Sequence, residues 1–145
     1  MVMILLRAAY ILYLIVLPAT CVFALWRGGR DERAATLALL GGIAGTHIAW
    51  LFGSNWQKPE LGIMAVDAAL FVAFVAVAHR SRRFWPIWIA AAQFAGVITH
   101  LAVVIHPNVV TELYRLTQPF WVFPILGGIA YGTWTGRRMN TSTYA

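Results

Sequence analysis

The sequence predicts an all-α protein, a polytopic bundle of five helices that cross a membrane. Of the 145 residues, 61% are hydrophobic and only 11% are charged, whereas soluble domains carry about a quarter charged residues. The apolar residues gather in five runs, each close to the roughly 20 residues that a helix needs to cross a hydrocarbon layer of about 30 Å. Most charged residues fall in the short gaps between these runs.

The five runs define the expected helices and together form one domain, residues 1–145. Each run is expected to be helical because lipid cannot satisfy the exposed polar groups of any other backbone. The first run is followed by no A-x-A-like cleavage site, so it is expected to stay as a helix that also directs insertion. The fifth run is the least regular. The expected helices cover residues 4–26, 34–52, 61–79, 84–105 and 119–134.

The positions of Lys and Arg predict how the bundle lies in the membrane. Along the four gaps and the C-terminal tail, their numbers are 3, 1, 3, 1 and 2. Cytoplasmic segments carry the excess of basic residues. The first gap, the third gap and the C-terminus are therefore expected in the cytoplasm, and the N-terminus outside, in a bacterial-type inner membrane. The seven tryptophans lie near run ends, where indole prefers to sit.

Composition also argues against several classes of function. The net charge of +6 does not indicate nucleic-acid binding, because basic residues between apolar runs act as topology signals and contact lipid headgroups. The single cysteine, Cys21, excludes an intrachain disulfide. The sequence lacks a P-loop, a His-Glu-x-x-His motif and a Gly-x-Ser-x-Gly motif. The gaps are too short for a soluble catalytic domain, so an enzyme acting by itself is not expected.

Polar residues inside the expected helices are the candidate functional residues. At 1.5 Å per residue, His47, Asp67 and His100 each lie about 8–9 Å inside the outer boundary of their runs, so three helices place them in one layer. Ionisable side chains at such depth are functional hypotheses by default. The second run holds Thr46 and His47, the third holds Asp67, and the fourth holds Gln93, Thr99 and His100.

The leading hypothesis is a small, non-catalytic accessory subunit of a larger membrane assembly. A chain with almost no mass outside the bilayer would act through its helix faces. Its expected partners are the lipid bilayer and other membrane subunits or a second copy of itself. Two Gly-x-x-x-Gly pairs, Gly41 with Gly45 and Gly128 with Gly132, allow helices to approach closely. They serve either internal packing or contact with a partner.

Two alternatives give the polar layer a chemical role instead of a purely structural one. In the first, His47 and His100 are the axial ligands of a haem b in an electron-transfer subunit, and Asp67 accepts the other ring N–H of one histidine. In the second, Asp67 is the central group of a proton-linked transporter or channel, with the histidines and Gln93 relaying protons. Structural pairing of these side chains remains the simpler interpretation.

A short repeat suggests an internal duplication. Residues 46–55 and 99–108 both follow the pattern Thr-His-[Ile/Leu]-Ala-x5-Asn. Both segments belong to runs with the same expected orientation, so a repeated two-helix unit would carry an axis along the membrane normal. Short apolar segments use few residue types, and chance similarity is the competing explanation.

Overall fold

The computed structural model describes residues 2–53, 61–105 and 118–141, and the regular structure of these residues is entirely helical. This confirms the all-α class. Four helices, α1 to α4, are long and apolar enough to cross a membrane. The elements follow in the order α1 (Val2–Arg27), α2 (Arg30–Gly53), α3 (Leu61–Arg80), α4 (Trp85–Ile105), η1 (Gln118–Trp121) and α6 (Val122–Thr141).

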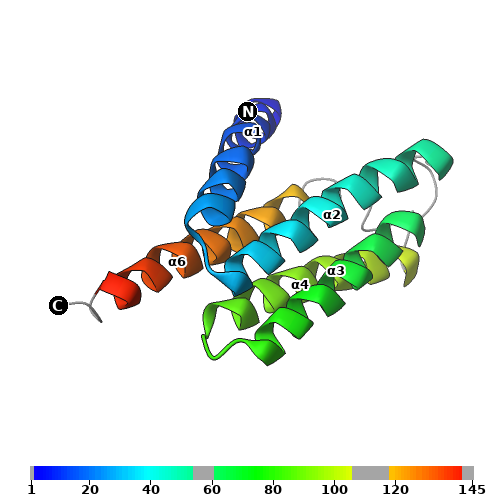
Figure 1. Ribbon diagram of the computed structural model, residues 1–145. Helices are drawn as coiled ribbons and strands as arrows, with labels where there is room; N and C mark the ends of the chain where they lie inside the picture. Colours follow the sequence, from blue (N-terminus) through cyan, green and yellow to red (C-terminus); the bar gives the residue numbers. More distant parts are fainter. Residues whose placement is uncertain (1, 54–60, 106–117, 142–145) are drawn as a thin grey trace.

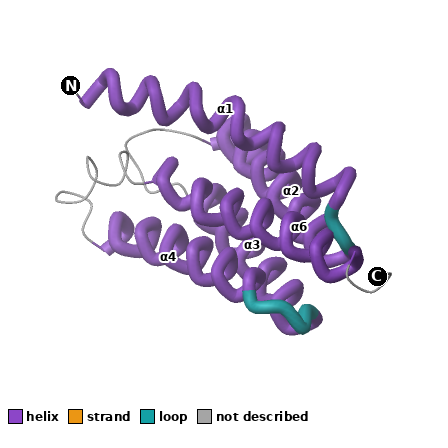
Figure 2. Tube along the Cα trace, turned by 90° about the vertical axis from the view of Figure 1, so that its left-hand side faces the viewer, coloured by secondary structure: helices purple, strands orange, loops and turns teal. Residues whose placement is uncertain are grey.

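The helices lie side by side and α3 packs between α2 and α4 (Figures 1 and 2). On its other side α4 packs against α6, and α1 contacts α6 and α2. Toward its N-terminus α1 leans away from the other helices (Figure 1). Every helix of the described chain therefore shares part of its surface with at least two others, and α1 is the most peripheral.

One end of the bundle is marked by arginines and is called here the arginine end. The turn between α1 and α2 and the turn between α3 and α4 meet there, because Glu32 of α2 forms an ion pair with Arg83. The opposite end, where α2 and α4 end and α3 begins, is called the far end. The arginines that flank the two turns are Arg27, Arg30, Arg33, Arg80, Arg82 and Arg83.

A helix cap explains why α2 begins at Arg30, before the expected residue 34. The backbone N–H of Gly29 donates to Oε2 of Glu32 at 2.9 Å. Glu32 is the third residue of α2, and a carboxylate at this position satisfies a backbone donor that the first turn leaves without a partner. The apolar run alone gave a later start because the first turn of α2 is charged.

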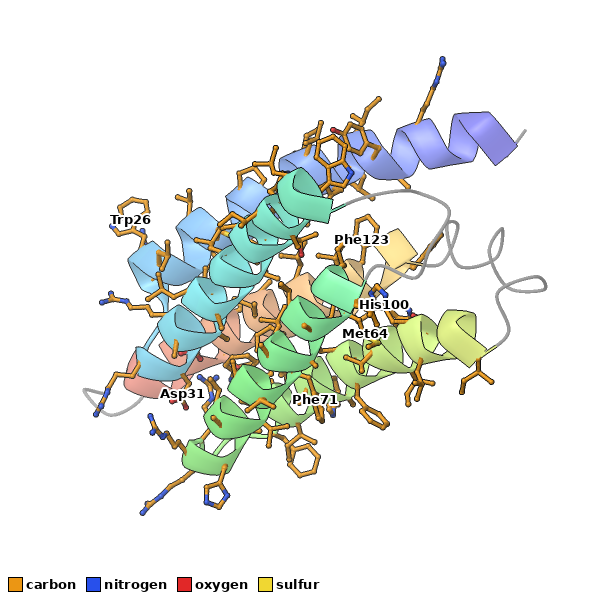
Figure 3. The ribbon with its side chains drawn as sticks, turned by 90° about the vertical axis from the view of Figure 1, so that its right-hand side faces the viewer. Trp26, Asp31, Met64, Phe71, His100 and Phe123 are labelled. Atoms are coloured by element: carbon orange, nitrogen blue, oxygen red, sulfur yellow. The ribbon has the colours of Figure 1, made fainter. Side chains whose placement is uncertain are left out.

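Buried apolar side chains concentrate near the arginine end. Phe74, Ile89, Leu126 and Ile129 are among the largest side chains that are fully buried, and they come from α3, α4 and α6. Trp85 is only 2% exposed, so it belongs to this core and not to the membrane interface, whereas Trp26 points away from the bundle (Figure 3).

The glycine pair of α6 allows α6 to pack closely on α4. A Cβ placed on Gly132 would lie 2.5 Å from Cε2 of Trp85, and one placed on Gly128 would collide with Ile89. Both added Cβ atoms would be far closer to their neighbours than van der Waals contact allows. In the described structure Gly128 and Gly132 therefore serve packing inside the bundle.

The glycines of α2 that pack against a neighbouring helix are not the expected Gly41–Gly45 pair. A Cβ on Gly41 would meet nothing within 4 Å, so this position faces open space. Gly45 lies against Val66 of α3, and Gly42 lies against Leu70 of the same helix. The close approach of α2 to α3 therefore depends on Gly42 and Gly45, three residues apart on one helix face.

The last helix differs from the expected range 119–134. It begins at Val122, after the turn η1, and continues to Thr141. The backbone hydrogen bonds of a helix continue beyond an apolar run where no breaker follows, so the polar C-terminal residues extend it. This helix is not among the four that are apolar enough to cross a membrane.

Candidate functional site

Asp67, Gln93 and His100 form a hydrogen-bonded cluster between α3 and α4, called here the Asp67 cluster. Oδ2 of Asp67 lies 2.6 Å from Nε2 of His100. Nε2 of Gln93 donates to Oδ1 of Asp67 at 3.1 Å and to its backbone carbonyl at 3.2 Å. Gln93 and His100 are seven residues apart, so two helical turns bring both side chains to the face of α4 that meets α3.

The Asp67 cluster lies inside the protein. His100 is 4% exposed and Gln93 is 5% exposed. The side chain of Asp67 is 17% exposed. The nitrogen–oxygen distance of 2.6 Å corresponds to a direct hydrogen bond between the imidazole and the carboxyl group. In Figure 3 His100 lies among the helices, on the far-end side of the packed core.

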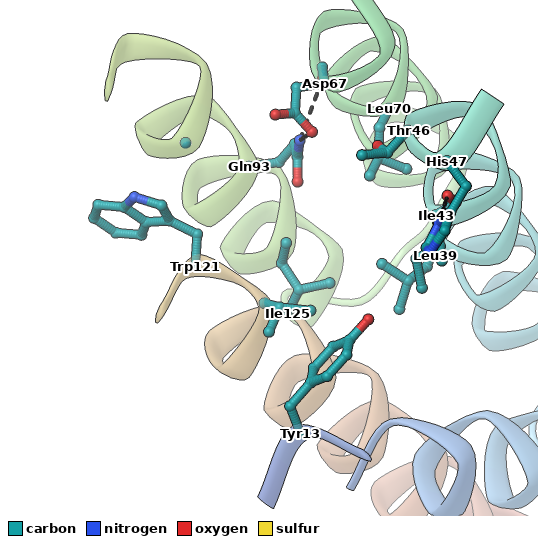
Figure 4. A pocket seen from close by; sticks show the side chains of 13 residues that line it. Tyr13, Leu39, Ile43, Thr46, His47, Asp67, Leu70, Gln93, Trp121 and Ile125 are labelled. Atoms are coloured by element: carbon teal, nitrogen blue, oxygen red, sulfur yellow. Dashed lines mark hydrogen bonds between the residues drawn. The ribbon is translucent and has the colours of Figure 1, made fainter. Parts of the chain in front are cut away.

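A cavity of about 180 Å³ opens beside the Asp67 cluster. Its wall comes from α1, α2, α3, α4, η1 and α6, so all the described elements contribute (Figure 4). Asp67 and Gln93 supply polar groups on one side, and the hydroxyl of Tyr13 points toward the cavity from α1 (Figure 4). The other lining residues are Leu39, Gly42, Ile43, Thr46, His47, Leu70, Gly96, Trp121, Val122 and Ile125.

The remaining predicted residues line the cavity or form hydrogen bonds within their own helices. Thr46 and His47 line the cavity from α2. Nδ1 of His47 lies 2.8 Å from the carbonyl oxygen of Ile43. Because a carbonyl only accepts, Nδ1 carries the hydrogen, and Nε2 of a neutral His47 is left with a lone pair. The hydroxyl of Thr99 donates to the carbonyl of Gly96 at 2.6 Å.

The two Thr-His segments therefore have different surroundings. His47 is exposed and bonds to its own helix, whereas His100 is buried and bonds to Asp67 of the neighbouring helix. The asparagines that complete the repeat, Asn55 and Asn108, lie outside the described residues. An internal duplication stays a prediction.

The cavity residues that sequence reasoning missed include two with large aromatic side chains. Tyr13 and Trp121 line the cavity, but both occur in or beside apolar runs, where aromatic residues carry no distinguishing pattern. The signal available for Tyr13 was its hydroxyl, because a buried tyrosine usually finds a polar environment for that group.

A second polar network was also missed, at the arginine end. Arg83 pairs with Glu32 through Nη1, and its Nη2 donates to the carbonyl of Gly132 at 2.7 Å and to the hydroxyl of Thr135 at 2.6 Å. One guanidinium therefore joins α2, the turn before α4, and α6. The side chain of Glu32 is only 3% exposed, which is unusual for a carboxylate unless it is paired.

Comparison of the chain with protein-family models, with curated proteins and with solved structures found no match. The chemistry of the site therefore has to be argued from its own groups. A carboxylate and an imidazole in direct contact can share and exchange a proton, and the adjoining cavity has room for a small molecule.

Proposed function

We propose that the chain is a small proton-linked transporter or channel in which Asp67 is the central ionisable group. The observation that carries this proposal is the position of Asp67, which contacts His100 and Gln93 and at the same time lines the cavity. An ionisable group inside a membrane is costly and is commonly part of a substrate or proton pathway. Purely structural pairing does not require the carboxylate to adjoin a cavity.

Proton flux into liposomes that contain the purified protein tests this function. We expect an imposed membrane potential to drive protons inward, measured with a trapped pH-sensitive dye. In Asp67→Asn the flux should fall to that of protein-free liposomes, because the amide cannot take up or release the proton. Asp31→Asn makes the same chemical change at the arginine end and should leave the flux unchanged. Equal flux in wild type and Asp67→Asn would overturn the proposal.

The finer topology is part of the same proposal: five spans, the N-terminus outside and the C-terminus inside a bacterial-type cytoplasmic membrane. The basic residues of the first and third gaps support it, because the ion pair of Glu32 with Arg83 places both gaps at one end. Basic gaps at one end are the pattern of the cytoplasmic side. The Asp67 cluster then lies in the outer half of the bundle.

An accessory subunit of a larger membrane assembly is the second candidate. The open position of Gly41 on α2 favours it, because a glycine on an exposed helix face lets a second helix approach closely. The occupant would be a transmembrane helix of a partner subunit. Gly41→Leu should then abolish co-purification of that subunit from mild detergent. Gly127 of α6 also faces open space, so Gly127→Leu tests that face separately, and the variant that loses the partner identifies the face that the partner covers.

Haem ligation by His47 and His100 stays a prediction. In the described arrangement Nε2 of His100 is held by Asp67, and the cavity of about 180 Å³ is far smaller than a porphyrin. The contact itself matches the predicted arrangement, in which Asp67 holds one ring nitrogen of a ligating histidine, but the helices would have to move apart to admit the macrocycle. An absorption spectrum of protein expressed with added haem decides the matter. A Soret band lost in His100→Ala would establish the ligand, and a featureless spectrum would remove this alternative.

A further inference from the structure

The volume of the cavity and the side chains of its wall indicate which molecules would fit. An enclosed apolar site of about 150 Å³ admits benzene, and this cavity measures about 180 Å³. Leu39, Leu70 and Ile125 contribute hydrocarbon to the wall, and Trp121 contributes an aromatic side chain. The cavity therefore has room for a ligand whose hydrocarbon group is about the size of a benzene ring.

The polar groups of the wall indicate the charge of the ligand. The carboxylate of Asp67 accepts hydrogen bonds and repels anions, so an ionic partner should be a cation with N–H donors. The contacts of Oδ1 with Gln93 and of Oδ2 with His100 hold the carboxylate at the wall of the cavity. The hydroxyl oxygens of Tyr13 and Thr46 can accept further hydrogen bonds from N–H groups of the ligand.

Resting on the proposed proton-linked function, we infer that the cavity binds a small organic ammonium ion at Asp67 in exchange for a proton of the Asp67–His100 pair. With that proton the pair is neutral overall. Without it the pair carries one negative charge, which is costly between helices in a membrane. A cation entering the cavity restores neutrality, so the proton and the ammonium ion exclude each other.

Other titratable groups near the exchange are few among the described residues. Tyr13 faces the cavity from α1 and His47 faces it from α2, while His100 reaches Asp67 from α4. The lining residues from η1 and α6 are Trp121, Val122 and Ile125, which do not titrate. The exchange balances as one ammonium ion bound and one proton released to water, with no bond broken other than that to the proton.

Calorimetric titration of the full-length protein in mild detergent with benzylammonium tests the inference. We expect binding to release up to about one proton, seen as a heat that depends on the ionisation enthalpy of the buffer. The affinity should rise with pH by up to about tenfold per unit, the limit for one exchanged proton. The sign follows because a higher pH removes the competing proton.

Two comparisons isolate the role of the carboxylate. Asp67→Asn should lose benzylammonium binding by at least about tenfold while its far-UV circular dichroism stays unchanged, and Asp31→Asn should bind as wild type does. Benzyl alcohol, which matches the ligand in size without its charge, should bind much more weakly. Equal binding of the alcohol, or an absence of benzylammonium binding to wild type, would overturn the inference.

These outcomes are separable from those of the flux experiment. Proton flux that needs Asp67, without benzylammonium binding, would retain the proposed function and reject this ligand class. Binding that needs Asp67, without proton flux in liposomes under either a membrane potential or a benzylammonium gradient, would retain the ammonium site and reject the proton-linked function.

Discussion

At the scale of single residues, Arg83 connects three segments of the described chain. Its guanidinium offers five N–H donors in a planar fork, and three acceptors on two helices use them: Glu32, Gly132 and Thr135. A Cβ on Gly136 would lie 2.8 Å from Nη1 of Arg83, so this glycine leaves room for the guanidinium. Lysine has a compact ammonium group and could not reach the same three acceptors together.

We expect Arg83→Ala to destabilise the protein by about 3 kcal/mol, the lower part of the range for breaking a buried ion pair. The lower part applies because the Arg83 side chain is 22% exposed, while Glu32 is 3% exposed and would keep an unpaired carboxylate. Thermal unfolding in detergent, followed by circular dichroism, measures the effect. The neighbouring Arg82 is exposed, and Arg82→Ala is the control. Equal melting temperatures for the two variants would contradict the role given to Arg83.

At the scale of the helices, large side chains of α4 pack against glycines of α6. Trp85 and Ile89 project from the first turns of α4, and Gly132 and Gly128 receive them on α6. The Nε1 atom of Trp85 has no hydrogen-bond partner among the described residues, so its ring is held there by packing. A large side chain of α4 facing a glycine of α6 brings the two backbones together and increases their contact.

Gly132→Ala should lower the thermal stability, since overpacking a filled core costs about 1–3 kcal/mol. The added Cβ would lie 2.5 Å from Cε2 of Trp85, and this ring is buried and cannot turn aside easily. Gly127→Ala adds the same methyl group on the same helix, where nothing lies within 4 Å. The melting temperature of each variant in detergent compares them. A Gly132→Ala protein as stable as Gly127→Ala would show that α6 does not depend on this close approach.

Much of this architecture could be predicted from hydropathy, and its departures have identifiable physical causes. The apolar runs indicated helices because lipid admits little else. The start of α2 was missed because a cap made by Glu32 extends it into charged residues. The location of Trp85 was missed because indole is favourable at an interface and in a core, and only the facing glycines of α6 decide between them.

The candidate site was predictable in its members and not in its connections. Depth along each helix placed His47, Asp67 and His100 in one layer, but rotation about the helix axis decides which side chains meet. That rotation brings His100 to Asp67 and leaves His47 exposed on α2. The cavity depends on α1 and α6 as well as on these three helices, and a single sequence carries no signal for such long-range packing.

At the scale of the whole molecule, the two halves of the bundle differ. The buried apolar core and the Arg83 network occupy the arginine end, while the cavity and the Asp67 cluster lie toward the far end. The molecule is therefore firmly packed at one end and hollow at the other. The proposed transport across the membrane would require the packed arginine end to open.

The course of α6 along α4 leads to a prediction about the number of spans. A Cβ placed on Gly96 of α4 would lie 3.7 Å from Cδ1 of Trp121, just before α6 begins, whereas Trp85 at the start of α4 packs on Gly132. The two helices therefore run antiparallel over much of the length of α4, and α4 is long and apolar enough to cross the membrane. A helix that follows α4 over this length should cross the membrane as well.

Cysteine labelling tests whether α6 crosses. In a Cys21→Ala background, we expect Ser81→Cys and Thr141→Cys to resist a membrane-impermeant maleimide in intact cells and to react in inverted vesicles. Both positions should lie in the cytoplasm because two crossings, by α4 and α6, separate them, and the basic gap at Arg80 and Arg82 fixes the side. Reaction of both cysteines after detergent is the control. Labelling of Thr141→Cys alone in intact cells would mean that α6 does not cross, because one crossing would then separate the two positions.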